Sequence, residues 1–352
     1  MKIEHGIHTF ELYLNHLHYH EIQRSIDYLV KQKSIQFRLS DKENVDRYMT
    51  SPYFAKCGIL LRMYQTLENS NGMGLIINPS TLLTGKEQPT ALYTPQRESL
   101  EQISDTVEMV LEKVQLNVEE QKITLCQLDL TMNIWMPKDG LLEEYIRFFH
   151  KGICPSHFQN ITQKCEREQF YMIASQTIAV KAYDKAYELQ KRRRYPEECS
   201  QRRLLRLEVS LKRDALLRKL GVSREAGYEK VLKKGGKRGT EVIAEYLKQV
   251  FPSCATHRSY SESKKRVEET VKDLKLQEQM LFLLRKTSDG AGLTTAVEKL
   301  KKKYQKIDKQ RMKVIWRKFD EIDVNPVTIP NQKKIKELPC IRTLVGEYLA
   351  EE

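Results

Sequence analysis

Apolar and polar residues alternate strictly in two segments near the middle of the chain. The segment at 125–135 reads LCQLDLTMNIW, and the segment at 204–212 reads LLRLEVSLK. Successive side chains of a β-strand point to opposite faces, so this pattern predicts two strands with one buried and one polar face. The polar positions are Gln127, Asp129, Thr131 and Asn133 in the first strand and Arg206, Glu208, Ser210 and Lys212 in the second.

A third segment, at 170–185, predicts a β-hairpin. It reads FYMIASQTIAVKAYDK, in which two apolar runs flank a turn near Gln176. On this interpretation Tyr171 lies on the first arm, whereas Lys181, Tyr183 and Lys185 share one face of the second arm.

The N-terminal region predicts a mixture of strands and helices. His8–Leu14 alternates like a strand, while Glu21–Lys31 and Glu98–Val114 resemble amphipathic helices. The stretch at 68–95 is rich in Gly, Asn, Pro and Ser, which predicts turns flanking short strands. We therefore expect an α+β fold with an antiparallel sheet of about five strands and helices on one face.

The last third of the chain changes character. Strand patterns end near Asp214, and helical patterns dominate to about Lys318. One long amphipathic helix is predicted at 264–286 and a second, very basic helix at 298–319, with a break at GAGLTT between them. The segment KKGGKRG at 233–239 is interpreted as a flexible basic loop. We expect two domains, at 1–220 and 221–352, of which the second is basic and mostly helical.

Charge and composition restrict the function further. The chain has 60 Lys+Arg against 47 Asp+Glu, a net charge of +13, which favours a nucleic-acid partner. The seven Cys form no CxxC pair, so a zinc ribbon is not expected, and their scatter is typical of reduced thiols in a cytosol. No apolar run approaches the roughly 18 to 20 residues of a membrane helix, and the N-terminus does not resemble a signal peptide. We expect a cytoplasmic protein.

The polar strand faces carry groups suited to cutting a phosphodiester. Asp129 and Glu208 offer the oxygen ligands that Mg²⁺ and Mn²⁺ prefer. A nearby tyrosine can attack the phosphate and hold the cut 5′ end covalently, while a lysine or arginine offsets the developing charge. No GxxxxGK[ST] motif is present, so a built-in helicase motor is not supported and a host helicase is an expected partner.

Four segments then resemble one known group of proteins, in the family's order. LDLTMNIWMP with YIRFFHKGICPSHF resembles a RIDxxxN strand and the helix and turn after it. FYMIASQTIAVKAYDKAYELQ resembles "fYigSxxsxxxxxxYDKxxE", LLRLEVSLKRDALLRKLG resembles "lRfEvxlk", and VNPVTIP resembles a motif after the last helix. These are features of the filamentous-phage gene II/X-type replication endonucleases and related Gram-positive plasmid and phage initiators.

The resemblance implies a rolling-circle replication initiator with a His-hydrophobe-His-endonuclease-like core. Such a protein nicks and rejoins one strand of origin DNA through a phosphotyrosine intermediate, using a divalent metal. The metal strand here carries no His, which departs from the superfamily's pattern. The metal ligands carried over are Asp129 and Glu208, with Asn133 as a secondary third. The candidate catalytic residues are Tyr171, Tyr183 and Lys185. The basic run Lys191, Arg192, Arg193 and Arg194, together with Arg206, is the candidate DNA contact, and its structural alternative is a solvated loop.

Each assignment has a structural alternative. His16-Leu17-His18 fits His-hydrophobe-His literally, but it follows the first strand and is interpreted as a solvated turn and helix start. Asp129 could be a structural carboxylate, and Glu208 could belong to a cross-strand ion-pair ladder. Lys185 could be an ordinary solvated lysine. Either tyrosine could pack in the core, which leaves Tyr171 as the first choice of nucleophile and Tyr183 as the second.

Two other functions stay open at this point. A relaxase that processes a mobile element for transfer would use the same chemistry with other partners. A non-catalytic DNA-binding regulator would keep the fold and the charge without the tyrosine chemistry.

Overall fold

The structure is a computed structural model that describes most of the 352-residue chain. The described residues are 1–38, 47–65, 71–117, 123–137, 141–163, 166–192, 199, 202–304, 307–333 and 335–351.

A ten-stranded sheet dominates the fold, in the order β2-β3-β4-β5-β1-β6-β10-β9-β8-β7. The pairs β1–β5, β2–β3, β3–β4, β4–β5, β7–β8 and β8–β9 are antiparallel. The predicted α+β class is confirmed, although the sheet has more strands than expected. The strands are β1 Lys2–Leu17, β2 Gln36–Arg38, β3 Arg47–Ser51, β4 Ile59–Gln65, β5 Asn71–Ile77, β6 Ile123–Pro137, β7 Gln159–Asn160, β8 Phe170–Ala174, β9 Ile178–Asp184 and β10 Arg202–Lys212.

The chain forms two compact units that interleave in sequence. One contains Met1–Ile3, Asn133–Leu207 and Glu241–Glu352, and the other contains Glu4–Met132 and Glu208–Thr240. The strands β6 and β10 each contribute to both units. The division near residue 220 into a nicking part and a DNA-recognition part concerns function, and it stays a prediction.

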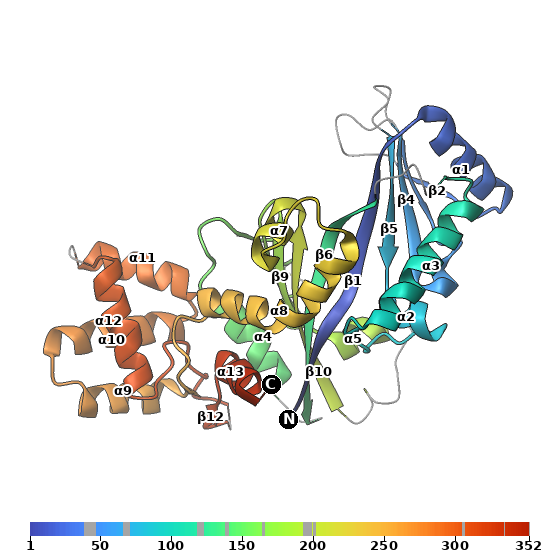
Figure 1. The fold of residues 1–352 in the computed structure, drawn as a ribbon. Helices are drawn as coiled ribbons and strands as arrows, with labels where there is room; N and C mark the ends of the chain where they lie inside the picture. The colour runs from blue at the N-terminus through green and yellow to red at the C-terminus, as the bar shows by residue number, and fades with distance from the viewer. Residues whose placement is uncertain are drawn as a thin grey trace. The chain divides into compact units, whose positions relative to one another are not determined.

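The unit that begins at Glu4 holds the predicted N-terminal helices. α1 spans Tyr19–Lys31 and α3 spans Arg97–Lys113, close to the expected bounds (Figure 1). Ser25 Oγ of α1 donates a hydrogen bond to the Val114 carbonyl at the end of α3, which ties these helices together. The apolar stripe of α3 is buried, as its spacing predicts.

A short helix in this unit was not expected. α2 spans Pro79–Thr84 directly after β5, within a stretch interpreted as turns and strands. Asn78 caps the helix by accepting a hydrogen bond from the Thr81 amide at 3.0 Å, and Pro79 occupies the first turn. Local capping therefore outweighs the turn-rich composition.

The expectation of a flexible loop at 233–239 is wrong, because these residues lie inside the helix α8, Tyr228–Val250. The glycines allow close packing. A Cβ on Gly235 would lie 2.5 Å from Leu128 Cδ2, and a Cβ on Gly236 would lie 2.6 Å from Pro95 Cδ. α8 therefore packs on the apolar side of β6, opposite to the side of Asp129. α7, Arg213–Leu220, precedes it.

The other unit contains most of the remaining helices. α4 is Leu142–Lys151, α5 is Lys185–Lys191, α9 is Tyr260–Thr270, α10 is Leu274–Ser288, α11 is Leu293–Lys303, α12 is Lys309–Glu321 and α13 is Ile341–Glu351. β11, His257–Arg258, pairs with β12, Glu337–Leu338. Around α9 to α12 lies a core that includes Val267, Met280, Leu284, Leu300 and Phe319.

Each of the two long C-terminal helices that the sequence predicts is divided into two. Asp273 caps α10 by accepting from the Leu276 amide, so the predicted 264–286 helix separates into α9 and α10. Asp308 caps α12 through the Arg311 amide, which divides the 298–319 helix. Continuous hydrophobic spacing hides such breaks, because aspartate competes for backbone amides only locally. The break between the two predicted helices is confirmed at Gly290, which has φ +97°.

None of the described helices is long and apolar enough to cross a membrane.

The packing of Gly235 leads to a test of the fold. Gly235→Ala places a methyl group against fully buried Leu128, so we expect a loss of about 1–3 kcal/mol in the free energy of unfolding. Gly346→Ala is the matched control, because Gly346 lies in α13 with nothing within 4 Å. It should stabilise the protein by about 0.5–1 kcal/mol through helix propensity. Urea unfolding measures both, and equal effects would refute the close packing.

Candidate active site

Asp129 lies on the polar face of β6 with its carboxylate fixed by two neighbours. Thr9 Oγ1 of β1 donates a hydrogen bond to Asp129 Oδ2. Gln127 Nε2 donates to Asp129 Oδ1 at 3.1 Å. The residue is only 6% exposed, so these donors replace much of the water that a carboxylate needs.

Glu208 occupies the equivalent polar face of β10 and is 4% exposed. Its Oε2 lies 3.9 Å from Nδ1 of His8 on β1. His8 and Thr9 are neighbours in the sequence, so Glu208 and Asp129 both contact the same short segment of β1. The two carboxylates predicted from separate segments are therefore brought to the same part of the sheet.

The local shape of β1 explains how two adjacent residues serve this face. Ile7 and Phe10 are both in the core, although regular alternation would bury residues two apart. The alternation is therefore interrupted between Ile7 and Phe10, and both His8 and Thr9 are only partly buried.

An acidic residue of β1, Glu11, lies near these residues. Glu11 is mostly buried and accepts a hydrogen bond from Arg62 Nη1 of β4 at 3.4 Å. Gly74 makes the room, because a Cβ there would lie 2.6 Å from Glu11 Oε1. Burial, with the Glu11 charge as a further cause, raises the pKa of Cys126 to about 12, so this thiol stays neutral.

Sequence reasoning assigned no site role to His8, Thr9 or Glu11. The alternation of Thr9 and Glu11 with Phe10 and Leu12 was the available signal, since it places their polar side chains on one face of a strand. The contacts of His8 and Thr9 across the sheet had no signal in the sequence.

The donor set suits a hard divalent cation. Mg²⁺ usually binds one or two carboxylates and fills its remaining positions with water and substrate phosphate, so Asp129 and Glu208 provide enough protein ligands. Within the described residues there is no group of three or more His, Cys, Asp or Glu side chains that could hold a metal. A metal here would depend on those two carboxylates and on DNA.

Asn133 and Arg206, in the other unit, form a buried pair. Arg206 Nε donates to Asn133 Oδ1 at 2.8 Å, and neither side chain is exposed. Arg206 was expected to contact DNA, but its burial prevents such a contact in this structure. Its positive charge on Oδ1 also argues against Asn133 as a metal ligand.

The hairpin prediction is confirmed by β8 and β9, and its register separates the two tyrosines. Tyr171 pairs with Ala182, whereas Tyr183 pairs with Phe170, so the two tyrosines point to opposite faces. Tyr171 is 2% exposed and packs against Phe149 of α4, with ring centroids 5.4 Å apart. Burial raises the pKa of its phenol well above the usual value. Tyr183 is 8% exposed and lies on the face away from that contact.

Lys185 does not continue the face of β9, which corrects the sequence expectation. β9 ends at Asp184, and Lys185 is the first residue of α5. Asp184 starts the helix by accepting a hydrogen bond from the Tyr187 amide at 3.0 Å. Lys185 is buried, bonds to Glu188 at 2.5 Å and lies 6.0 Å from the centre of the Tyr183 ring.

The basic run after α5 is only partly described. Lys191 and Arg192 are exposed, and they lie 3.7 Å from Glu166 Oε1 and 2.8 Å from Glu188 Oε1, respectively. Arg193 and Arg194 lie outside the described residues.

The His16-Leu17-His18 segment is the end of β1 followed by the start of α1, so the expected helix start is present but the strand runs to Leu17 in place of the expected turn. His16 has a positive φ of 59° at the end of β1, and His18 caps α1. The terminal VNPVTIP motif is likewise structural here. Val327 O is 2.7 Å from His257 Nδ1, and Asn325 Nδ2 donates to the Ala255 carbonyl.

No protein-family model matches the chain, and no curated protein sequence matches it. Among solved structures, similarity is found to a rolling circle replication initiator protein from Geobacillus stearothermophilus. The alignment covers 71% of this chain and 86% of that chain at 9% identity, with a TM-score of 0.37.

The contacts of Asp184 predict what the YDK segment does for stability. Besides capping α5, its buried carboxylate accepts a hydrogen bond from Arg203 Nη2 at 2.6 Å. Asp184→Asn keeps a capping oxygen and loses the charge, whereas Asp184→Ala loses both. We expect Asp184→Ala to lose about 3–5 kcal/mol in urea unfolding, with Asp184→Asn losing at least 1 kcal/mol less. Equal losses in the two variants would show that the cap contributes nothing.

Proposed function

We propose that this protein nicks one strand of DNA with a tyrosine, with the help of a divalent metal, and so starts rolling-circle replication. One observation carries the proposal. Asp129 of β6 accepts a hydrogen bond from Thr9, and Glu208 of β10 lies 3.9 Å from the adjacent residue His8. Buried carboxylates at one place are costly to a fold, so they are typical of a functional site. The net charge of +13 suits a DNA partner.

In this proposal Asp129 and Glu208 hold Mg²⁺ or Mn²⁺ together with the scissile phosphate. When bound, the ion supplies positive charge that polarises the phosphate. Thr9 and Gln127 fix the orientation of the Asp129 carboxylate. His8 lies beside Glu208, with its Nδ1 3.9 Å from Glu208 Oε2.

Tyr183 is the nucleophile that the packing favours. Its phenol oxygen would bond to phosphorus while the bond to the 3′ oxygen breaks, and that oxygen would leave with a proton as a free hydroxyl. The expectation that Tyr171 attacks is supported less well, because that ring is packed against α4. Lys185 would act through its charge near the Tyr183 ring rather than as an exposed base.

DNA contacts outside the centre would come from exposed cations. Lys191 is the last residue of α5 and Arg192 follows it, and both side chains are exposed. Phosphate contacts of this kind give affinity without sequence information. A host helicase would have to separate the strands, since the chain carries no nucleotide-triphosphatase loop.

The first test removes each carboxylate's charge without changing its shape. Asp129→Asn and Glu208→Gln should each lower the rate of nicking of single-stranded origin DNA in Mn²⁺ by about 100-fold, because a ligand is lost. Glu101→Gln, on the exposed surface of α3, is the control and should nick at the wild-type rate. Thermal melting checks that the variants fold. Wild-type nicking by either carboxylate variant would exclude that residue from the metal site.

The second test identifies the nucleophile by removing one hydroxyl at a time. Tyr183→Phe should abolish the covalent protein–DNA adduct on a denaturing gel, while Tyr171→Phe should retain it. The reverse result would assign the attack to Tyr171. If wild-type protein binds origin DNA but never forms an adduct in Mg²⁺ or Mn²⁺, the protein is a regulator rather than a nickase.

A further inference from the structure

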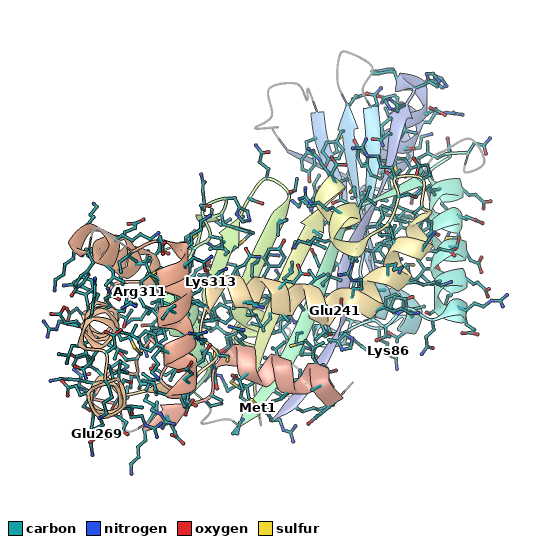
Figure 2. All side chains as sticks on the ribbon, turned by 60° about the vertical axis from the view of Figure 1, so that its left-hand side comes forward. Met1, Lys86, Glu241, Glu269, Arg311 and Lys313 are labelled. Atoms are coloured by element: carbon teal, nitrogen blue, oxygen red, sulfur yellow. The ribbon has the colours of Figure 1, made fainter. Side chains whose placement is uncertain are left out.

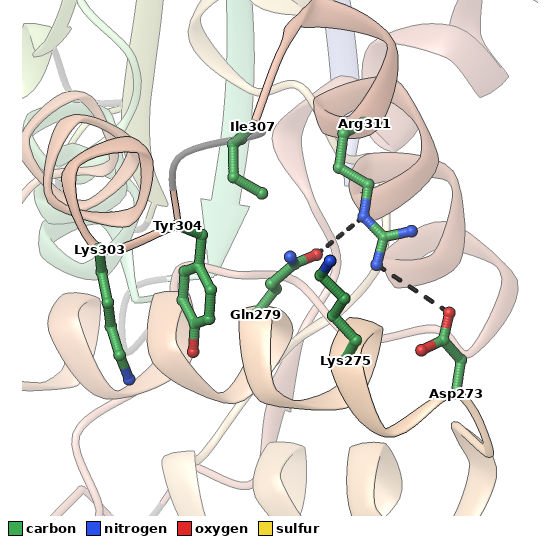
Figure 3. A pocket seen from close by; sticks show the side chains of 7 residues that line it. All are labelled: Asp273, Lys275, Gln279, Lys303, Tyr304, Ile307 and Arg311. Carbon is green, nitrogen blue, oxygen red and sulfur yellow. Dashed lines mark hydrogen bonds and ion pairs between the residues drawn. The ribbon is translucent and has the colours of Figure 1, made fainter.

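A cavity of about 450 Å³ lies within the C-terminal helices, far along the chain from the carboxylates. It is open on one side and is lined by residues of α10, α12 and the end of α11 (Figure 3). Its size falls in the range of small-molecule sites. The residues that line it are Asp273, Lys275, Gln279, Lys303, Tyr304, Ile307 and Arg311.

The charge of this cavity favours an anion. Lys275, Lys303 and Arg311 face one carboxylate, Asp273. The cavity also lies at two helix starts, because Lys275 belongs to the first turn of α10 and Arg311 to the first turn of α12. Both helix starts are already capped by their own carboxylates, Asp273 and Asp308, so the attraction for a phosphate comes from the three cationic side chains.

Arg311 is held at the wall of this cavity by two neighbours. Its Nε donates to Oε1 of buried Gln279 at 2.8 Å, which holds the guanidinium in position. Its Nη2 is 4.0 Å from Asp273 Oδ2, too far for a hydrogen bond, and this atom is buried with no hydrogen-bond partner among the described residues (Figure 3). The guanidinium therefore brings a fixed positive charge to the cavity wall, with one nitrogen bonded to Gln279 and another paired with Asp273.

An aromatic ring forms another part of the wall. Tyr304 is half-buried, and Lys303 Nζ lies 5.0 Å from its ring centre. Its hydroxyl is held by Glu278 Oε2 at 3.3 Å, which keeps the ring in place at the rim. A flat, fixed aromatic side chain next to cations suits a nucleobase attached to a phosphate.

We propose that this cavity binds a nucleoside phosphate unit. Arg311, Lys275 and Lys303 hold the phosphate, and Tyr304 contacts the base. The proposal goes beyond the nicking function and does not depend on the carboxylates of the sheet. The same chemistry is presented by a nucleotide within a DNA strand and by a free mononucleotide.

The test uses charge reversal at exposed positions of the full-length protein. Lys275→Glu with Lys303→Glu changes the cavity, while Lys301→Glu with Lys313→Glu makes the same change in charge on α11 and α12 outside its lining (Figure 2 labels Lys313). Fluorescence anisotropy measures binding of a labelled single-stranded oligonucleotide at several salt concentrations. Calorimetry measures binding of thymidine 5′-monophosphate, thymidine and inorganic phosphate.

We expect the cavity pair to lose about tenfold more affinity than the control pair for whichever ligand binds, and to reduce the salt slope for DNA by about 2. Arg311→Lys keeps the charge but removes the forked donors, and it should weaken binding as well. Loss of only oligonucleotide affinity assigns the cavity to a DNA strand. Loss of mononucleotide affinity assigns it to a free nucleotide.

Equal weakening by the two double variants would overturn the proposal, since any two lysines would then serve. Inorganic phosphate that binds as tightly as the mononucleotide would overturn the role of Tyr304 and the nucleotide assignment. Because these readouts are binding alone, they stay valid whether or not the protein nicks DNA.

Discussion

The burial of two carboxylates on central strands is the constraint on which the site depends. A charged group removed from water destabilises a fold unless hydrogen bonds or opposite charges replace the lost hydration. The Asp129 carboxylate accepts hydrogen bonds from Thr9 and Gln127, and Glu208 lies beside His8. The positions of β1, β6 and β10 are therefore fixed relative to one another by polar contacts as well as by the core. A fold that accepts this cost at one point is typical of a protein that uses the charges.

The sequence predicted the parts that follow from strict alternation. Asp129 and Glu208 were found because each stands between apolar residues of a strand, where the period of two leaves little choice of face. The burial of both Ile7 and Phe10 interrupts that period, and the contacts of His8 and Thr9 with the carboxylates had no signal in the sequence. Lys185 was misplaced for a related reason, since the cap at Asp184 ends the strand one residue earlier than the alternation suggests.

Local caps and close packing explain the remaining differences. Asp273 and Asp308 divide two predicted helices, and the breaks they create also form the walls of the C-terminal cavity. The glycines of α8 were interpreted as a flexible loop, because composition alone cannot tell a flexible glycine from one that lets two elements approach closely. In both cases the deciding partner lies far away in the sequence.

The central claim is that Asp129 and Glu208 together hold a divalent metal. Electron paramagnetic resonance of Mn²⁺ measures this directly, because bound and free ions give different signals, and it needs no catalytic turnover. With single-stranded DNA present, the account predicts one bound Mn²⁺ per chain in the wild type and none in the combined Asp129→Asn and Glu208→Gln variant. Equal Mn²⁺ binding by the two proteins would contradict it.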